Sequence, residues 1–273
     1  MVGRLAAVIG SPVAHSLSPA IHRAGFAAAG VDWSYVAFEV ADGQAGAALD
    51  AMRTLGIAGL SVTMPHKAAV AERVDRLDPA ARALRSVNTV SWDGEHLVGS
   101  STDGAGFVAS LDDAGVEVDG ARVAVIGAGG AARSLVDALA RAGAIDITVL
   151  NRTAERAESA AALAPVASPG GVGDLSGADI VVNATSVGMG DDRHVPCDPA
   201  LLREGQVVAD LVYHPIRTRW LAAACERGCR TVDGLGMLVH QAALQQRIWL
   251  GDDAVIDTVA MRAAAEAVLT ARA

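Results

Sequence analysis

Aromatic residues, cysteine and long hydrophobic runs are all scarce in this 273-residue sequence. Aromatics make up 3% of the chain, so Ala, Val and Leu must fill any core. The three cysteines are too few for a disulfide framework. Cys225 and Cys229 lie four residues apart, and no His or Cys partner at metal-ligand spacing accompanies that pair. We therefore interpret Cys197, Cys225 and Cys229 as ordinary buried or surface thiols.

The sequence also lacks a membrane-spanning or secretory segment. No apolar run approaches the ~20 residues that cross a bilayer. The apolar stretch 5–9 is too short for a signal peptide, and no small-residue cleavage site follows it. We expect a soluble, cytoplasmic protein without a membrane partner.

The charge balance argues against a nucleic-acid partner. The formal net charge is -9, and such a surface repels phosphates. Hydrophobic residues make up 52% and charged residues 19%, which is enough for a packed core and argues against disorder. The length fits one large or two medium domains. We expect a small-molecule substrate and a monomer or homodimer.

Strands and helices alternate along the first half of the chain, as in βαβ units. Ser18 is the predicted N-cap of the first helix, with Pro19 at its first position. Asp93-Gly94 predicts a hairpin turn. The expected strands cover 4–10, 33–40 and 57–62, and the expected helices cover 18–30, 44–55 and a segment opened by Pro65.

A second alternating series begins at Arg122. The expected strands are 122–127, 146–151, 179–184 and 206–211, and the expected helices are 104–114, 130–142, 153–163, 236–250 and 254–271. The Gly-, Pro- and Ser-rich stretch 165–177 predicts a surface loop. We expect a two-domain α/β protein. An N-terminal α/β domain with a mainly parallel sheet (1–103, completed by 236–273) would accompany a second α/β domain (104–235).

A glycine-rich turn follows the strand at 122–127 and opens a helix. The segment Gly127-Ala128-Gly129-Gly130-Ala131-Ala132 has the pattern G-x-G-x-x-A. Gly127 permits the tight turn, Gly129 lets the backbone approach a pyrophosphate, and Ala132 allows close packing of helix on strand. The amide groups at the helix start would then hold the phosphates, which predicts a dinucleotide site and, over residues 104–235, a Rossmann-type dinucleotide-binding domain. The alternative is a purely structural turn.

The end of the next strand distinguishes NADP from NAD. An NAD site usually has Asp or Glu there for the ribose hydroxyls, whereas this sequence has Asn151-Arg152-Thr153. Arg152 can grip a 2′-phosphate in a bidentate manner, and Arg156 lies one helical turn on. The sequence therefore favours NADP, although both arginines could be plain surface charge.

Short polar motifs follow two strands of the first half. Ser16 and Ser18 lie at a predicted helix start, where hydroxyls suit a carboxylate. Lys67 lies near the start of another helix, where a cation is unfavourable. An anionic partner such as Asp103 would explain that placement, since the pair could transfer a proton at a carbinol oxygen. The alternatives are an N-cap for Ser18 and a surface lysine for Lys67.

These motifs resemble those of the shikimate dehydrogenase family along most of the chain. The matching segments, in order, are GSPVAHSLSPAIH (10–22), SVTMPHK (61–67), SVNTV (86–90), STDG (101–104), GAGGAAR (127–133), NRT (151–153), NATSVGM (183–189), DLVYHP (210–215) and GLGMLVHQAA (234–243).

The resemblance implies a reaction and a set of roles. The reaction is the reversible NADPH-dependent reduction of 3-dehydroshikimate to shikimate, in aromatic amino acid biosynthesis through chorismate. Lys67 and Asp103 would be the catalytic pair. Substrate would contact Ser16, Ser18, Thr63, Lys67, Asn88, Asp103, Tyr213 and Gln241. NADP would contact Gly127, Ala128, Gly129, Gly130, Ala131, Asn151, Arg152, Thr153, Arg156, Thr185, Val187, Met189, Leu211 and Gly234.

Two departures from the family leave the ring substrate open. The family commonly has Asn where this chain has Ser61 and Ser101, and a hydroxyl lacks the reach of an amide. The alternative is a related dehydrogenase acting on quinate or aminoshikimate. A nucleotide-binding regulator without turnover is disfavoured because both Lys67 and Asp103 are present.

Overall fold

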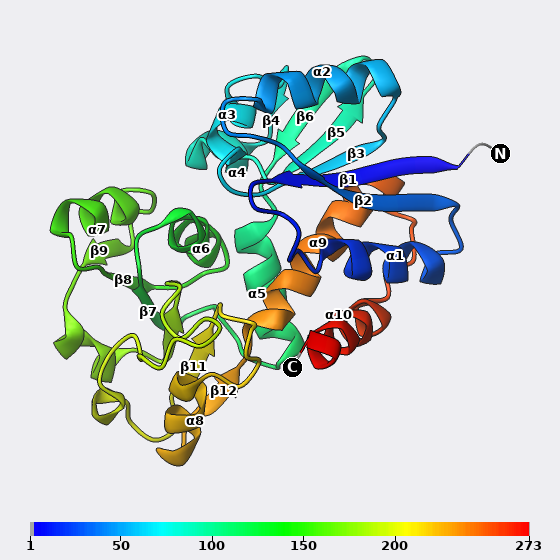
Figure 1. The fold of residues 1–273 in the computed structure, drawn as a ribbon. Coiled ribbons are helices and arrows are strands. Elements are labelled where there is room, and N and C mark those ends of the chain that lie inside the picture. The colour runs from blue at the N-terminus through cyan, green and yellow to red at the C-terminus, as the bar shows by residue number, and fades with distance from the viewer. Residues whose placement is uncertain (1–2, 273) are drawn as a thin grey trace. The chain divides into compact units, whose positions relative to one another are not determined.

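A computed structural model describes residues 3–272, which divide into two compact units. Unit 1 combines the chain up to Thr102 with the segment from Val239 onward, and unit 2 comprises Asp103–Leu238. Each unit contains one six-stranded, mainly parallel sheet with helices against it (Figure 1). The predicted α/β class with a Rossmann-type fold is confirmed.

The sheet of unit 1 has the strand order β2-β1-β3-β5-β6-β4. Strands β1, β2 and β3 are mutually parallel, β5 is antiparallel to β3 and to β6, and β4 is parallel to β6. The predicted hairpin of β5 and β6 is present, and its two turn residues are Gly94 and Glu95, because Asp93 still pairs with His96. The strands are β1 (Arg4–Gly10), β2 (Trp33–Glu39), β3 (Gly59–Val62), β4 (Arg76–Leu77), β5 (Thr89–Asp93) and β6 (His96–Ser100).

Both faces of β1 are buried, which explains its unbroken apolar sequence. Ala7 and Ile9 point into a core with helix α2 (Ala45–Leu55). Ala6 and Val8 point into a second core on the opposite face, which contains Phe26 of α1 (Ser18–Ala28). The remaining helices of this unit are α3 (Lys67–Ala71), α4 (Pro79–Leu84), α10 (Thr258–Arg272) and the C-terminal part of α9 (Gly234–Leu250).

The predicted cap of α1 is wrong by one residue. The N-cap is Leu17, and Ser18 is already the first helical residue. The Ser16 hydroxyl instead accepts a hydrogen bond from the Ser18 amide, at 3.2 Å. The Ser18 hydroxyl is therefore not committed to capping this helix.

Unit 2 has the strand order β12-β11-β10-β7-β8-β9, with every pair parallel. Numbered within the unit, this is the 3-2-1-4-5-6 order of dinucleotide-binding sheets read from the far edge. The strands are β7 (Arg122–Ile126), β8 (Asp146–Leu150), β9 (Ala167–Pro169), β10 (Ile180–Asn183), β11 (Val207–Asp210) and β12 (Arg230–Val232), and the helices are α5 (Asp103–Asp113), α6 (Gly130–Arg141), α7 (Ala154–Ala161) and α8 (Arg219–Glu226).

The stretch 165–177 is not wholly a loop, contrary to the sequence-based expectation. It contains edge strand β9, which pairs with β8, and a 3-10 turn, η1 (Val172–Gly177). Pro169 ends the strand at the sheet edge, where a missing amide donor is tolerated. A second 3-10 turn, η2 (Pro199–Leu201), precedes β11.

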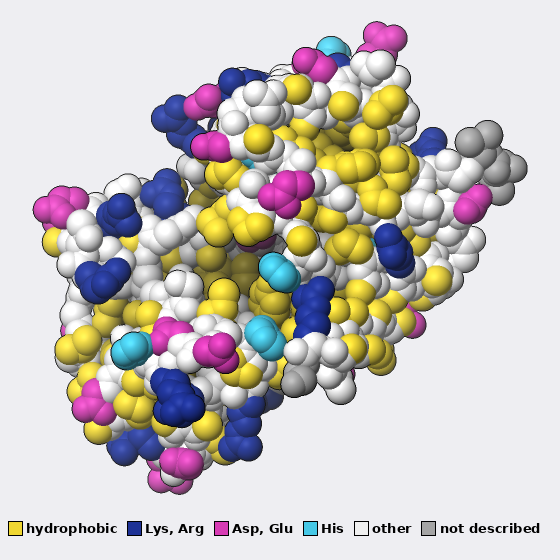
Figure 2. Space-filling model, viewed as in Figure 1, with side chains coloured by type: hydrophobic (Ala, Val, Ile, Leu, Met, Phe, Trp, Pro, Cys, Tyr) yellow, Lys and Arg dark blue, Asp and Glu magenta, His cyan; other side chains and the backbone are white. Residues whose placement is uncertain are grey.

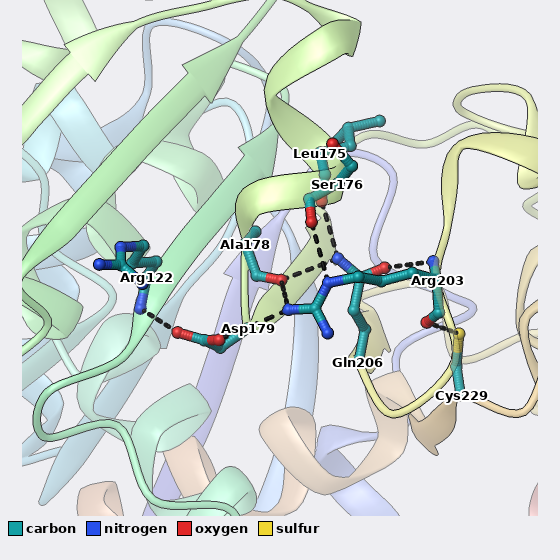
Figure 3. A network of polar contacts seen from close by, with 8 residues as sticks. All are labelled: Arg122, Leu175, Ser176, Ala178, Asp179, Arg203, Gln206 and Cys229. Carbon is teal, nitrogen blue, oxygen red and sulfur yellow. Dashed lines mark hydrogen bonds and ion pairs between the residues drawn. The ribbon is translucent and has the colours of Figure 1, made fainter.

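A buried glutamine fastens these turns at the amino ends of the strands (Figure 3). Gln206 is fully buried, and its amide donates to the carbonyls of Leu175 at 2.7 Å and Ala178 at 2.8 Å. Its amide oxygen accepts from the backbone of Arg203 at 2.8 Å. The glycine turn lies at the opposite side of the sheet, at the carboxyl ends of the strands, where dinucleotides bind in this fold.

The described residues include no cluster of side chains that could bind a metal ion and no helix that could span a membrane. Residues 3–272 have no group of three or more His, Cys, Asp or Glu that could hold a metal ion. None of the helices in that range is long and apolar enough to cross a membrane. All three cysteines are free thiols, with Cys229 buried.

Candidate active site

The glycine turn follows β7 directly and leaves open space above the start of α6. Gly127 has φ +119°, and a Cβ there would lie 2.9 Å from the Ala184 carbonyl, so this position needs glycine. At Gly129 and Gly130 a Cβ would meet nothing within 4 Å. The backbone of this turn is therefore accessible to a ligand. Ala132 is fully buried against the sheet, as its predicted packing role requires.

Two arginines lie on the surface beyond the end of β8. Arg152 and Arg156 are exposed, and within residues 3–272 neither has an ion-pair partner. Asn151, between β8 and α7, donates from its amide to the Thr153 carbonyl at 3.0 Å and so shapes the turn. Figure 2 shows dark blue arginine side chains over α6 and α7. This cluster of cations suits a phosphate group.

A buried Asn–Asp pair shapes the two loops after β10 and β11, and sequence reasoning missed it. The Asn183 amide donates to Asp210 Oδ1 at 2.8 Å and to the Val187 carbonyl at 3.2 Å. Asn183 Oδ1 accepts from the backbone amide and the hydroxyl of Thr185, at 3.1 and 2.7 Å. The predicted cofactor residues Thr185 and Val187 are thus held in place from beneath.

Asp210 is 1% exposed and serves as the acceptor for the neighbouring loop. Its carboxylate accepts from the Val212 amide at 3.0 Å and from the Thr218 hydroxyl at 2.7 Å. Burial raises the pKa of Asp210 above its ordinary value, and these hydrogen bonds oppose the rise. Gly234 starts α9 so close to β11 that a Cβ would lie 2.4 Å from the Leu211 carbonyl. Met189 is 48% exposed on the adjacent loop.

In unit 1, Ser16, Ser18 and Thr63 lie after the carboxyl ends of β1 and β3. Thr63 donates its amide to the Ile9 carbonyl at 2.9 Å. A Cβ on Gly10 would come within 2.4 Å of the Thr63 methyl group, so glycine at position 10 makes room for Thr63. Ser18 is 9% exposed and lies beside the hydroxyl of buried Tyr35. These hydroxyls therefore gather at one edge of the sheet.

Asn88 and Gln241 meet in the folded chain although 153 residues separate them. The Asn88 amide donates to Gln241 Oε1 at 3.4 Å and to the Thr102 hydroxyl at 2.9 Å. That hydroxyl donates in turn to the Gln241 backbone carbonyl at 3.1 Å. Asn88 is 2% exposed and Gln241 8%, so both are held with little freedom. The structure thus brings together two of the predicted hydroxyl-binding residues.

The three remaining predicted residues begin or follow secondary structure elements. Lys67 is the first residue of α3 in unit 1, and its backbone carbonyl accepts from the Val87 amide at 3.0 Å. Asp103 is the first residue of α5, and Tyr213 follows β11; both belong to unit 2. The pairing of Lys67 with Asp103 stays a prediction.

One signal for Lys67 was available in the sequence and was overlooked. Lysine and arginine together number 22, and Lys67 is the only lysine among them. A guanidinium cannot give up its proton in a protein, whereas an ammonium can. Among the 22 lysine and arginine side chains of the sequence, Lys67 is therefore the one that can give up a proton.

The strand order and the open glycine turn place unit 2 in the Rossmann class. Three family descriptions match the sequence: shikimate dehydrogenase substrate binding domain over residues 8–90, shikimate/quinate 5-dehydrogenase over 111–187, and shikimate 5′-dehydrogenase C-terminal domain over 234–266. The chain belongs to the shikimate dehydrogenase family.

Relatives agree with this membership over nearly the whole chain. The shikimate dehydrogenase (NADP(+)) of Moorella thermoacetica is 43% identical over 264 residues, covering 92% of this chain and 90% of its own length. The structure of shikimate 5-dehydrogenase from Thermus thermophilus, in complex with NADP(H) and shikimate, has a TM-score of 0.91 at 34% identity, covering 97% of this chain and 99% of that one.

A structure with another named activity is also similar. The ligand-free 5-ketofructose reductase of Gluconobacter sp. strain CHM43 has a TM-score of 0.90 at 35% identity, covering 97% of this chain and 99% of that one. Likeness of fold at this level therefore does not by itself identify the ring substrate.

Proposed function

We propose that this chain catalyses the reversible NADPH-dependent reduction of 3-dehydroshikimate to shikimate, in aromatic amino acid biosynthesis through chorismate. The observation that carries the proposal is the buried cluster of Asn88, Thr102 and Gln241, whose polar side chains are fixed by one another. A fixed set of amides suits a substrate with several hydroxyls, because each hydroxyl needs a partner in a set position.

The two units divide the work in this proposal. Unit 1 binds the ring acid, with Ser16 and Ser18 holding the carboxylate and with Thr63, Asn88 and Gln241 binding the hydroxyls. This assigns substrate binding to unit 1, whose bounds lie within three residues of the expected domain of 1–103 with 236–273. Residues 104–235 then bind the dinucleotide. A monomeric or homodimeric state and a cytoplasmic location stay predictions from the sequence.

The cofactor site is proposed from the residues that the glycine turn and the adjacent loops present. The exposed amides at the start of α6 fit a pyrophosphate. The space beside Gly129 and Gly130 is open, because a Cβ built at either position would meet nothing within 4 Å, so a phosphate can approach the backbone. Arg152 and Arg156 fit a 2′-phosphate, and the position after β8 lacks the carboxylate that would repel it. The other residues proposed to contact NADP are Gly127, Ala128, Ala131, Asn151, Thr153, Thr185, Val187, Met189, Leu211 and Gly234.

When bound, NADPH supplies the hydride for the carbonyl carbon. The Lys67 ammonium donates a proton to the carbonyl oxygen as that oxygen becomes a hydroxyl, and accepts it back in the reverse direction. The Asp103 carboxylate holds the ammonium in place, and Tyr213 lies near the substrate carboxylate. Asp103 directly follows Thr102, so their Cα atoms are about 3.8 Å apart. The bonds from Thr102 to Asn88 and Gln241 support this role for Asp103.

The alternative is a quinate or aminoshikimate dehydrogenase of the same family. A matrix of initial rates with shikimate and quinate, each with NADP⁺ and NAD⁺, separates these functions. The proposal expects the highest kcat/KM for shikimate with NADP⁺. A preference for quinate would reassign the substrate, and a preference for NAD⁺ would remove the phosphate role of Arg152. No measurable rate with any of the four combinations of substrate and cofactor would refute the family activity.

A further inference from the structure

A buried chain of hydrogen bonds runs through unit 1 beneath the residues proposed to bind the substrate hydroxyls, and Gln245 lies at its centre. Gln245 is 2% exposed and one helical turn beyond Gln241 on α9. Its amide nitrogen donates to Gln241 Oε1 at 3.1 Å and to the Asn88 backbone carbonyl at 3.2 Å. One buried side chain thus contacts both residues.

The oxygen of the Gln245 carboxamide is held as firmly as its nitrogen. It accepts from the Ser61 hydroxyl at 2.5 Å and from His22 Nε2 at 3.1 Å. With two donated and two accepted bonds, the carboxamide uses its full hydrogen-bonding capacity. Rotating it by half a turn would place donors against donors, so its orientation is fixed.

Two aromatic residues keep the acceptor side of Gln245 supplied with donors. Tyr35 is fully buried and donates to the Ser61 hydroxyl at 2.7 Å, which leaves the Ser61 proton for Gln245. The Tyr35 ring is stacked on the His22 ring, with centroids 4.2 Å apart. Burial lowers the pKa of His22 to about 3, so His22 is neutral at physiological pH. Its Nδ1 accepts from the Gln246 amide at 3.3 Å, which leaves the ring proton on Nε2, facing Gln245.

These bonds determine which end of the Gln241 carboxamide faces away from the interior. Gln241 Oε1 accepts from Gln245 and from Asn88, so the oxygen is turned toward the buried chain. In a planar amide the nitrogen diverges from the oxygen at the trigonal carbonyl carbon, so the nitrogen of Gln241 is directed to another side than its oxygen. Gln241 consequently presents N–H donors, which suit the oxygen of a ring hydroxyl.

We propose that Gln245 is a positioning residue that sets the orientation of Gln241 and thereby the recognition of one ring hydroxyl. The inference rests on the proposed function, because it takes Gln241 as a substrate contact. It also gives a role to Ser61, where the family commonly has asparagine. The Ser61 hydroxyl is hydrogen-bonded to Tyr35 and to Gln245. Its effect on the substrate is therefore indirect: it helps to hold Gln245, which in turn orients Gln241.

The decisive variant is Gln245→Met, which keeps the length of the side chain and removes its hydrogen bonds. The matched control is Gln206→Met: Gln206 is also a fully buried glutamine that donates to two backbone carbonyls, but its described hydrogen bonds all lie in unit 2. Ser61→Ala is a milder second variant that removes one donor to Gln245 and changes little volume. The substrates are shikimate and two analogues that each lack one of the non-reacting ring hydroxyls.

We expect Gln245→Met to raise KM for shikimate about tenfold, with a smaller change in kcat, because the lost contact binds ground state and transition state alike. One deoxy-analogue should be almost insensitive to the substitution, since it lacks the hydroxyl that Gln241 binds. Ser61→Ala should raise the ratio of KM for shikimate to KM for that analogue in the same direction, and Gln206→Met should leave this ratio unchanged. Equal losses for shikimate and both analogues would overturn the proposal, because they would indicate a general structural effect.

A second measurement remains decisive even if shikimate is not the substrate. The side-chain amide resonances of Gln241 in ¹⁵N-labelled full-length protein should show a rigid carboxamide in the wild type and in Gln206→Met, and a mobile one in Gln245→Met and Ser61→Ala. Unchanged Gln241 mobility in a folded Gln245→Met protein would refute the positioning role. Absence of shikimate turnover in the wild type would instead refute the proposed function.

Discussion

The two units prepare their ligand-facing residues in different ways. In unit 1 the proposed substrate contacts Asn88 and Gln241 are buried and bonded to each other and to Gln245. In unit 2 the proposed phosphate contacts are exposed backbone at Gly129 and Gly130 and exposed arginine side chains. A buried network resists reorientation, whereas exposed charges adapt to a ligand. Substitutions in the first should therefore affect stability and specificity together, and those in the second should affect cofactor affinity alone.

The largest expected effect concerns the one lysine of the chain. Lys67→Arg keeps the positive charge but replaces the ammonium with a guanidinium that cannot give up a proton to the substrate, so kcat should fall about 10²–10⁴-fold, the usual contribution of a general acid. Affinity for NADP⁺ should stay nearly unchanged, as measured by fluorescence titration. The matched control is Arg73→Lys, which makes the reverse exchange at an exposed position two residues beyond the end of α3. Unchanged turnover in Lys67→Arg would remove Lys67 from the mechanism.

The single lysine also allows a chemical version of this test. An amine-selective acylating reagent can modify only Lys67 and the α-amino group of the chain. Acylation should abolish turnover, and saturating shikimate with NADP⁺ should protect against it. Inactivation at the same rate in the Lys67→Arg protein would show that the α-amino group, not Lys67, is responsible.

A smaller effect is expected where unit 2 would meet the 2′-phosphate. Arg152→Ala should raise KM for NADP⁺ about 10–100-fold, the range for a lost charge-assisted contact, with little change in KM for NAD⁺. Arg156→Ala should act in the same direction more weakly. Arg141→Ala, at the far end of α6 and paired with Asp137, is the control that should alter neither constant. An equal loss for NADP⁺ and NAD⁺ would give Arg152 a structural role instead.

The smallest expected effect is on stability, and it should appear in unit 1 because His22 is buried there. The pKa of His22 is lowered from 6.5 to about 3 in the folded chain, mainly by burial. Between those values the unfolded chain binds a proton that the folded chain does not, so stability is lost as pH falls below 6.5. From pH 7 to pH 5 the free energy of unfolding should drop about 2 kcal/mol on account of this group.

Denaturant titrations at the two pH values check this expectation against variants. His22→Asn should be less stable at pH 7, yet its loss between pH 7 and pH 5 should be about 2 kcal/mol smaller than that of the wild type. His96→Asn, at an exposed position of β6, should lose as much as the wild type. The same pH dependence in His22→Asn and wild type would show that His22 is not the group responsible.

The difference between local motifs in unit 2 and a long-range network in unit 1 also explains how much of the structure could be predicted from the sequence. The glycine turn at Gly127 and the arginines after β8 are local patterns of a few consecutive residues, and the structure places them as expected. Long strands such as β1 and β7 were predicted because their apolar runs are continuous. The elements that were missed are β4, α4, α8, β9 and β12; the three strands have only two or three residues each, too few for a periodic pattern.

The buried network of unit 1 could not be read from the sequence. Its partners are far apart in the chain, 184 residues for Ser61 with Gln245 and 223 for His22 with Gln245. Hydrogen-bonding side chains at such distances carry no local signal, and a lone histidine in an apolar stretch has many possible surroundings. The Thr218 cap of α8 is a different case, since its hydroxyl accepts from the Leu221 amide in a sequence-local pattern that could have been recognised.

The most direct test of the whole account is a crystal structure of the full chain with NADP⁺ and shikimate bound. The account predicts that the Lys67 ammonium and the Asp103 carboxylate lie within about 3 Å of the reacting hydroxyl, a hydrogen-bonding distance. It also predicts the 2′-phosphate against Arg152 and a donated bond from the Gln241 amide to a ring hydroxyl. A ternary complex in which the Lys67 and Asp103 side chains face different cavities would contradict it.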